Sequence, residues 1–494
     1  MDKIINVREY VEKNKNKVNQ EFRLGYHVMG EIGWINDPNG FCYYNGEYHL
    51  FFQYHPYSSK WGPMYWGHVK SKDLIKWDFL PVALAPDKDY DSEGCFSGSA
   101  IEKDGKLYLM YTGHVNPDTD KPEIVRQTQC IAFSEDSINF KKADQNPVID
   151  TSDLPENAMP VDFRDPKVIK RGEYYYAIIG SRREDTSGQI LLYKSKELLN
   201  WDYIGAIAGS HNKIGKMWEC PDLFLLDGTD VLIVSPQDIE SDGDRYNNIY
   251  ASLYMLGKMD FEKGKYTYNK IDEIDFGLDF YAPQTMIDDK GRRILIAWMQ
   301  MWNRRFPTDV QEHNWAGAMT LPREIRIIDG KLFQYPVYEI KNYRKNHVGY
   351  RKMKVTKTLS LEGIEGQSLE LEIEIDSQNS NMFGLKILKG ENQETVIYYD
   401  KNEGKITFNR SRSGEDLSLF ENGIADIRKV PIELKNNVLK IHIFIDRCSV
   451  EIFLQDGERV MTSTVYPKAT SRMIEFITDN EIIIRSLDKW DIVK

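Results

Sequence analysis

The sequence of 494 residues lacks the features that mark several large protein classes. Its five cysteines are scattered and form no CxxC pair, which argues against a disulfide framework or a zinc site and favours a reducing cytoplasm. No run of 18 apolar residues exists, and the N-terminus has no apolar signal-peptide core. HExxH, Walker-loop and GxGxxG motifs are also absent. We therefore expect a cytoplasmic protein without a metal or a cofactor.

Charge and aromatic content narrow the class further. The net charge of −12 argues against nucleic acid as a partner. Aromatic residues are abundant, with 29 Tyr, 21 Phe and 10 Trp, which suits β-structure and sugar-stacking sites. Near the start, Val7, Val11 and Val18 predict a short amphipathic helix within an N-terminal extension of residues 1–30.

One pattern recurs five times in the first 330 residues: an apolar run, a turn with glycine, and a second alternating run. The turn glycines are Gly46, Gly105, Gly172, Gly228 and Gly291. A second motif, seen as SKDLIKW, SEDSINF and SKELLNW, stays in step with the first. Strand pairs repeating at this period are typical of propellers. We predict an all-β chain with a five-bladed β-propeller over residues 31–336, since unrelated hairpins in a sandwich would not explain the second motif.

The five-fold pattern stops after residue 336. Alternating runs such as SLELEIEI and VLKIHIFID follow, separated by turn residues. They predict a linker over residues 337–351 and an antiparallel β-sandwich over residues 352–494. We expect the sandwich to have a structural role, covering one side of the propeller.

Hairpin register predicts which side chains reach the central channel. The first strand of each blade lines the channel, so residues seven to nine positions before each turn glycine should lie at one channel mouth. These residues are Asp37, Ser97, Asp165, Glu219 and Ala282, the last of which follows Tyr281. Gln53 and Trp298, seven residues after their turn glycines, should return to the same end.

Three carboxylates at one channel mouth indicate chemistry rather than stability, because buried like charges raise each other's pKa. A cation site is one alternative, since hard cations prefer oxygen ligands. Glycoside hydrolysis is the interpretation we favour. It needs one carboxylate as nucleophile or base and another as acid.

Ordered motifs make the sequence resemble glycoside hydrolase family 32, the β-fructofuranosidases. They are WINDPNG at Trp34, QYHPYSSKWGPMYWGH at Gln53, FSGS at Phe96, RDP at Arg164, ECPD at Glu219, DFYAPQ at Asp279 and WAGAMTLPRE at Trp315. WINDPNG alone has the composition of a surface turn, but so many motifs in order are specific. The C-terminal IHIFIDRCSVEIFLQDG extends the resemblance. Ile35 and Cys448 depart from the more usual Met or Leu and Ser, without affecting catalysis.

The resemblance implies a role for each residue that matches a motif. Asp37 is expected to be the nucleophile on the anomeric carbon of fructose, and Glu219 the general acid and then the general base. Asp165 is expected to stabilise the transition state by holding fructose hydroxyls. The substrate-binding residues are expected to be Asn36, Gln53, Trp61, Phe96, Ser97, Arg164, Tyr281 and Trp298.

The implied reaction is hydrolysis of the fructosyl bond of sucrose 6-phosphate or sucrose, with retention of configuration. Intracellular family members commonly cleave sucrose 6-phosphate after uptake by a phosphotransferase system. No glycine-rich loop or arginine cluster marks a phosphate cradle, however. Asp37 and Glu219 both lie nine residues before a turn glycine, so we expect them about 5–5.5 Å apart, as retention requires.

Several alternatives stay open at this point. Fructans or fructo-oligosaccharides are possible substrates within the same family. A propeller that binds sugar without turnover, and an inverting furanosidase of the arabinanase type, are rivals. The expected partner is a small saccharide, with neither nucleic acid nor a membrane, and the oligomeric state is not indicated.

Overall fold

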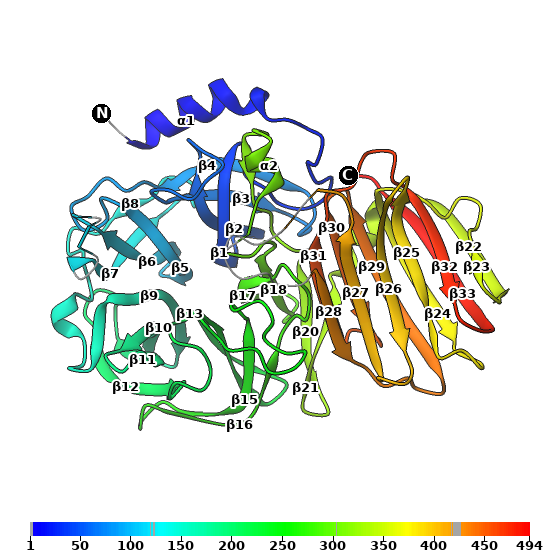
Figure 1. Ribbon diagram of the computed structural model, residues 1–494. Helices are drawn as coiled ribbons and strands as arrows, with labels where there is room; N and C mark the ends of the chain where they lie inside the picture. Colours follow the sequence, from blue (N-terminus) through cyan, green and yellow to red (C-terminus); the bar gives the residue numbers. More distant parts are fainter. Residues whose placement is uncertain (1–2, 119, 122–123, 303, 416, 418–425) are drawn as a thin grey trace.

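The structure is a computed structural model that describes residues 3–118, 120–121, 124–302, 304–415, 417 and 426–494. It consists mostly of β-strands in two units that lie side by side, with one helix above the first unit (Figure 1). No helix in these described ranges is long and apolar enough to cross a membrane.

Five sheets lie between residues 33 and 336, each built largely from strands that follow one another in sequence. The first contains β1 (Gly33–Tyr44), β2 (Glu47–His55), β3 (Tyr65–Ser71) and β4 (Trp77–Leu84). The second contains β5 (Gly94–Lys103), β6 (Lys106–Val115), β7 (Arg126–Ser134) and β8 (Lys141–Lys142). The third contains β9 (Ala158–Arg171), β10 (Tyr174–Arg183), β11 (Gly188–Ser195) and β12 (Asp202–Gly209).

The remaining two sheets of this unit continue the pattern. The fourth contains β13 (Trp218–Leu226), β14 (Thr229–Pro236), β15 (Leu253–Asp260) and β16 (Lys265–Glu273). The fifth contains β17 (Tyr281–Ile287), β18 (Arg293–Trp298), β20 (Arg323–Ile328) and β21 (Lys331–Pro336). Short helical turns occupy η3 (Thr151–Asp153) and α2 (Pro307–Val310).

The first strands of the five sheets contact one another in a closed ring. β1 contacts β5, β5 contacts β9, β9 contacts β13, β13 contacts β17, and β17 returns to β1. The short strand β19 (Trp315–Ala316) pairs in parallel with β1, where Gly33 lies opposite Trp315. The late part of this unit therefore completes the sheet that its first strand begins.

The hairpin turns lie where the repeat predicts them. All five turn glycines have positive φ, between 61° and 82°. Such values strain residues with a Cβ, and glycine adopts them freely. A Cβ would meet nothing within 4 Å at any of the five, so backbone conformation alone requires glycine there.

The C-terminal unit has two antiparallel sheets of six strands. One contains, in spatial order, β22 (Arg344–Val355), β33 (Ile482–Ile492), β24 (Ser368–Asp376), β29 (Val438–Asp446), β30 (Ser449–Leu454) and β31 (Arg459–Thr464). The other contains β23 (Thr358–Leu359), β32 (Met473–Thr478), β25 (Met382–Gly390), β26 (Gln393–Asp400), β27 (Lys405–Arg412) and β28 (Ile427–Pro431). Alternate apolar side chains of both sheets form one core, which is the arrangement expected of a sandwich.

The segment expected as a linker, residues 337–351, holds η4 (Tyr338–Tyr343) and the first part of β22. The predicted N-terminal helix is confirmed as α1 (Lys3–Asn14), followed by η1 (Lys15–Lys17). Val7 and Val11 are buried and α1 contacts β4. Val18 is also buried, but it lies just beyond the helical turns.

Buried charges join the two units. Arg323 of β20 is fully buried, and its guanidinium contacts Asp275 at 3.0 Å and Glu451 of β30 at 2.5 Å. The His27 ring lies between Asp446 at 2.8 Å and Glu451 at 2.9 Å. Burial by itself would lower the pKa of His27, but its hydrogen bonds to Asp446 and Glu451 outweigh burial and raise it to about 9. The Arg323 pair fixes the sandwich against the fifth sheet, and the His27 pairs fix it against the segment that precedes β1.

Candidate active site

Each of the five first strands carries one extra residue at the same stage of its hairpin. At one point in each hairpin, the first strand advances by one residue more than the strand it pairs with. These points lie between Ile35 and Pro38, Phe96 and Gly98, Arg164 and Lys167, Glu219 and Asp222, and Tyr281 and Gln284. A bulge bends its strand and re-aims the side chains beside it. Asp165, Cys220 and Ala282 adopt positive φ in these bulges, and a proline follows each of them. The sequence thus bends all five inner strands at one level of the ring.

A cavity of about 440 Å³ lies at this level. Nine of the predicted site residues line it: Asn36, Asp37, Gln53, Trp61, Phe96, Ser97, Arg164, Asp165 and Glu219. Trp61 is 48% exposed, so its ring is open to solvent at the mouth. Asn36, Gln53 and Ser97 are buried. The wall therefore combines carboxylates and amides with an open aromatic face, a composition suited to a sugar.

Asp37 is held by polar contacts from its own strand and from β5. The Ser97 hydroxyl of β5 donates to Oδ2 at 2.7 Å, and the Asn36 amide donates to Oδ1 at 3.1 Å. Asn36 in turn accepts a hydrogen bond of 2.8 Å from the Trp34 indole. Burial and the Glu219 carboxylate raise the pKa of Asp37, while the donors act in the opposite direction.

Asp165 is held by the backbone of the next sheet. The Cys220 N–H donates to Oδ2 at 3.0 Å, and the Cys220 thiol lies 3.6 Å from Oδ2 of both Asp165 and Asp37. Both carboxylates therefore converge on one residue of β13. Burial raises the pKa of Asp165 to about 7; Arg164 opposes this rise, and Glu219 and Asp37 add to it.

Glu219 is fully engaged by donors. Arg164 donates to Oε1 through Nε at 3.1 Å and Nη2 at 2.8 Å, and the Tyr281 hydroxyl donates to Oε2 at 2.6 Å. Arg164 also donates to Asp162 at 2.6 Å. One guanidinium thus serves several acids, and the three central carboxylates are not matched by an equal number of cations.

Tyr281 and Trp298, also predicted for the substrate site, lie behind the wall. Tyr281 is 1% exposed, and its hydroxyl contacts Glu219 and the Ser235 carbonyl. Trp298 is fully buried, with its ring centroid 5.8 Å from that of Trp34. In the described structure they support wall residues and do not line the cavity themselves.

Several wall residues were not predicted from the sequence. They are His114, Val125, Gln127, Val161, Asp162, Gln237, Tyr250 and Trp302. His114 stacks on Phe96 with centroids 4.1 Å apart and planes 10° apart, and burial, then Arg164, lowers its pKa to about 4. His114 and Gln127 lie on the second and third strands of their sheet. Counting residues back from the turn glycine along the first strand does not identify them.

The family assignment follows from direct comparison. The family model of the glycosyl hydrolases family 32 N-terminal domain matches residues 27–336, and the model of the family 32 C-terminal domain matches residues 339–491. The chain belongs to glycoside hydrolase family 32. The resemblance stated from the motifs is thereby confirmed, and the protein is a glycoside hydrolase by family.

Named family 32 relatives cover nearly the whole chain. A sucrose-6-phosphate hydrolase of Zymomonas mobilis is 36% identical over 96% of this chain and 93% of its own length. A raffinose invertase of Escherichia coli is 38% identical over 91% of this chain and 90% of its own. Among solved structures, sucrose-6-phosphate hydrolase from Lactobacillus gasseri superposes with a TM-score of 0.87 at 30% identity, covering 98% and 96% of the two chains.

A family 32 structure with a bound sugar is also similar. It is a mutant of a β-fructofuranosidase of Bombyx mori in complex with sucrose, with a TM-score of 0.84 and 34% identity. The superposition covers 99% of this chain and 98% of that one. A relative with the same fold as this chain therefore binds sucrose.

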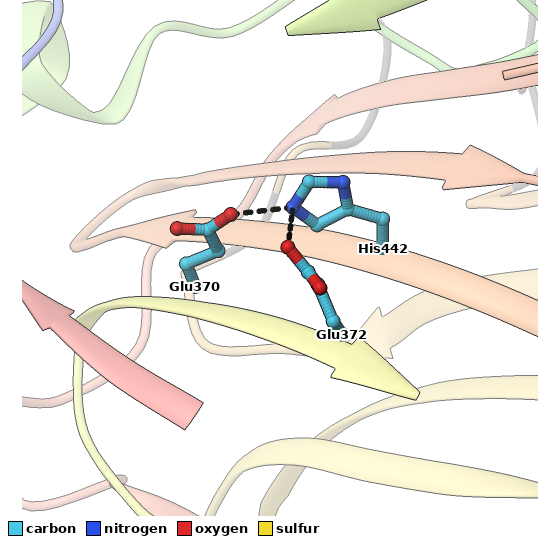
Figure 2. A group of neighbouring side chains, drawn as sticks. All are labelled: Glu370, Glu372 and His442. Atoms are coloured by element: carbon cyan, nitrogen blue, oxygen red, sulfur yellow. Dashed lines mark hydrogen bonds and ion pairs between the residues drawn. The ribbon is translucent and has the colours of Figure 1, made fainter. Parts of the chain in front are cut away.

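Outside the cavity, one group of described residues has the spacing of metal ligands. Glu370 and Glu372 of β24 and His442 of β29 place one ligand atom each within 4.8 Å of one another (Figure 2). His442 Nε2 lies 2.6 Å from Glu370. Arg344 donates twice to Glu370, at 2.7 and 2.6 Å, and once to Glu372, at 2.5 Å. The two carboxylates thus already share one guanidinium, and we interpret the group as an ion-pair network.

Proposed function

We propose that this family 32 hydrolase is a β-fructofuranosidase that cleaves the fructosyl bond of sucrose 6-phosphate or sucrose with retention of configuration. The observation that carries the proposal is the convergence of Asp37, Asp165 and Glu219 in one cavity. The relatives named sucrose-6-phosphate hydrolase and the sucrose-bound fructofuranosidase support the choice of substrate.

In the proposed first step, the Asp37 carboxylate attacks the anomeric carbon of fructose. Glu219 gives its proton to the glycosidic oxygen as that bond breaks, so the leaving sugar departs with a hydroxyl. Ser97 and Asn36 hold Asp37 in one orientation through their hydrogen bonds. A fixed nucleophile saves orientational entropy at the transition state.

In the second step, water attacks the same carbon and gives a proton to Glu219, and the bond to Asp37 breaks. Arg164 and Tyr281 fix the two oxygens of Glu219 throughout. Asp165 is proposed to hold fructose hydroxyls and to stabilise positive charge on the ring. Trp61, Phe96 and Gln53 supply the remaining contacts to the sugar.

The architecture in this proposal is the predicted one. The closed ring of first strands supports five blades around a channel, one sheet to a blade. We propose an N-terminal extension of residues 1–30, a propeller of residues 31–336, a connection of residues 337–351 and a sandwich of residues 352–494. A cytoplasmic location is also proposed, supported by five cysteines that are all free thiols.

The proposal is tested by comparing kcat/KM for sucrose, sucrose 6-phosphate, raffinose and inulin. We expect sucrose 6-phosphate to exceed sucrose by about 10- to 150-fold, the value of one charge-assisted contact to phosphate. Equal efficiencies on the two sugars would show that no such contact exists. A preference for inulin would move the protein to the fructan hydrolases, and arabinan as the better substrate would contradict a fructosidase.

A sugar-binding protein without turnover is the rival from another class. The sequence disfavours it, because no Asn or Gln replaces any of the three carboxylates. Binding of sucrose without release of reducing sugar would establish the rival.

A further inference from the structure

Two loops form part of the cavity wall beyond the strand ends, where Trp61 and Val125 also lie. One comprises residues 237–252 between β14 and β15, and the other comprises residues 299–302 and 304–314 between β18 and β19. We call them the mouth loops. They contribute Gln237, Tyr250 and Trp302 to the cavity. With the fructosyl unit against the carboxylates, as proposed, the attached sugar lies in the outer part of the cavity, where these loops form part of the wall.

The second mouth loop is anchored through Asp279, which lies just before β17 and is 2% exposed. Arg304 of that loop donates to Asp279 Oδ1 at 2.8 Å. On the other side, Arg410 of β27 donates to Oδ2 at 2.5 Å and to the Thr464 carbonyl at 2.8 Å. The Thr464 N–H also donates to Oδ2 at 2.8 Å. A buried carboxylate therefore connects the sandwich to the loop that carries Trp302.

The first mouth loop is tied to the same group. Asn248 Oδ1 accepts from Arg304 at 2.9 Å and also from Arg428 of β28. Arg428 donates to the Asn247 carbonyl at 2.9 Å as well. In Figure 1, β28 and β31 lie on the side of the sandwich that faces the fifth sheet. Arginines of the sandwich thus hold both mouth loops.

A further contact is independent of these charges. Gln300, two residues before Trp302, donates to the Tyr466 hydroxyl at 2.9 Å. Gln300 is 4% and Tyr466 3% exposed, so water does not substitute for this bond. Tyr466 follows β31 and belongs to the C-terminal unit. The loop is therefore fixed at two points by side chains of the sandwich.

The mouth loops in turn contact the groups that hold the carboxylates. The Tyr250 ring packs edge-on against Tyr281, with centroids 5.9 Å apart, and Tyr281 donates to Glu219. The Trp302 ring stacks on Trp34 at 5.8 Å, and Trp34 donates to Asn36. Tyr281 alone thus lies between Tyr250 and Glu219, whereas Trp34 and Asn36 both lie between Trp302 and Asp37.

We propose that Asp279, Arg410 and Tyr466 are positioning residues, through which the C-terminal sandwich sets the mouth loops and so the binding of the leaving-group sugar. This inference rests on the proposed function. It assigns the sandwich a part in recognising substrate, in addition to covering one side of the first unit. Arg410 and Tyr466 act through the mouth loops and touch no substrate themselves.

The experiment compares Arg410→Met and Tyr466→Phe with wild type on two substrates. Sucrose has a sugar leaving group, whereas β-fructofuranosyl fluoride has a single atom in its place. Because small misplacement of a binding group costs up to about 100-fold, we expect Arg410→Met to lower kcat/KM for sucrose by about 10- to 100-fold, mainly by raising KM. Tyr466→Phe removes one hydrogen bond and should cost about 3- to 10-fold. The fluoride should change less than about 2-fold in both variants.

Two controls separate positioning from loosened structure. Arg410→Lys keeps the charge at Asp279 and should recover much of the sucrose activity. Arg344→Met removes another arginine of the sandwich, one that donates to Glu370 of β24 at 2.7 Å and contacts neither mouth loop in the described structure. It should leave both substrates unchanged. Thermal unfolding of every variant shows that the protein measured is folded.

Equal losses on sucrose and on the fluoride, or losses in Arg344→Met as large as those in Arg410→Met, would overturn the inference. An unchanged KM in Arg410→Met would also overturn it. If wild type releases no fructose, the proposed function fails, and the inference is judged by calorimetric binding of sucrose. Arg410→Met should then bind about 10-fold more weakly, and equal affinity, or no binding by wild type, would contradict it.

Discussion

The cavity and the boundary between the two units both contain buried acids, but the two sets are neutralised differently. In the cavity, burial raises the pKa of Asp37 and Asp165, and Arg164 donates hydrogen bonds to Glu219 and Asp162 but, in the described structure, to neither of these two. At the boundary, burial would raise the pKa of Asp279, but Arg410 and Arg304 outweigh it and keep the pKa below its ordinary value. Burial also raises the pKa of Asp275 at the boundary, despite Arg323, so a raised pKa alone does not mark a reactive group; the cavity acids differ because they line a cavity.

The largest effect should come from the cavity acid that is proposed as nucleophile. Asp37→Ala removes the atom that bonds to fructose in both steps, and loss of a nucleophile costs on the order of 10⁵- to 10⁶-fold in kcat. Stability should not fall by a comparable amount, because one of several like charges is removed. Kinetics on sucrose and a thermal melt test both points. Turnover within about tenfold of wild type would exclude Asp37 as nucleophile.

The opposite outcome is expected at the boundary. Glu451→Gln leaves Arg323 and His27 without one of their acids, and breaking a buried pair costs about 3–5 kcal/mol of unfolding free energy. Denaturant unfolding measures the loss. Glu458→Gln is the matched control, since Glu458 pairs with the partly exposed Lys331 at 2.5 Å and should cost less than about 1 kcal/mol. Similar losses in the two variants would remove the distinction between the regions.

Glu219→Ala tests the proposed acid and base. Loss of general acid catalysis should lower kcat on sucrose by about 10²- to 10⁴-fold, while a substrate with a good leaving group retains its first step. Azide should partly rescue the variant and give a fructosyl azide of retained configuration. Carbon-13 NMR of the first product follows the configuration, because the anomeric carbon of fructose bears no proton. An α-furanose as first product would rule out double displacement.

Asp165→Asn should lower kcat by about 100- to 1000-fold, the usual cost of one positioned electrostatic partner, and the protein should still fold. A near-normal rate would remove Asp165 from the reaction. A variant that fails to fold would show instead that Asp165 belongs with the structural acids of the boundary.

The same variant should also change the pH dependence of stability. The folded-state pKa of Asp165, about 7, lies above its ordinary value of 3.8, so folding binds a proton more tightly. The contribution to stability is complete below about pH 4 and is lost as pH rises through 7, with a slope of at most about 1.4 kcal/mol per pH unit. Denaturant unfolding from pH 4 to 8 should show this slope in wild type and a shallower one in Asp165→Asn. Parallel curves would contradict it.

The cavity residues on the first strands could be predicted because turn glycines and strand alternation are local signals in the sequence. Nine of the predicted residues line the cavity, from Asn36 to Glu219. Counting residues from the turn glycine assumes regular pairing along the strand, however, and the bulges make that pairing irregular. The nine residues from Asp37 to Gly46 span two irregularities in β1, whereas those from Glu219 to Gly228 span one in β13. Equal counts therefore do not mean equal height in the channel.

Other parts of the site had no local signal. Gln237, Tyr250 and Trp302 lie in loops, whose paths depend on contacts made after the sheets assemble. The anchors of these loops, such as Arg410, come from the other unit and are more than 100 residues away in sequence. Neither periodicity nor spacing indicates such pairs. Tyr281 and Trp298 were predicted for the correct region, but sequence does not distinguish a wall residue from the one behind it.

Cys220 lies among the acids of the cavity, and this position decides its redox chemistry. Burial, then Asp165, Asp37 and Glu219, raises the pKa of its thiol far above the ordinary value. Peroxides and alkylating agents react with the thiolate, which this surrounding suppresses. The side chain is also 4% exposed. Burial first, and then the negative charge that the proposed chemistry requires, thus keep the cysteine beside the proposed nucleophile in its less reactive thiol form.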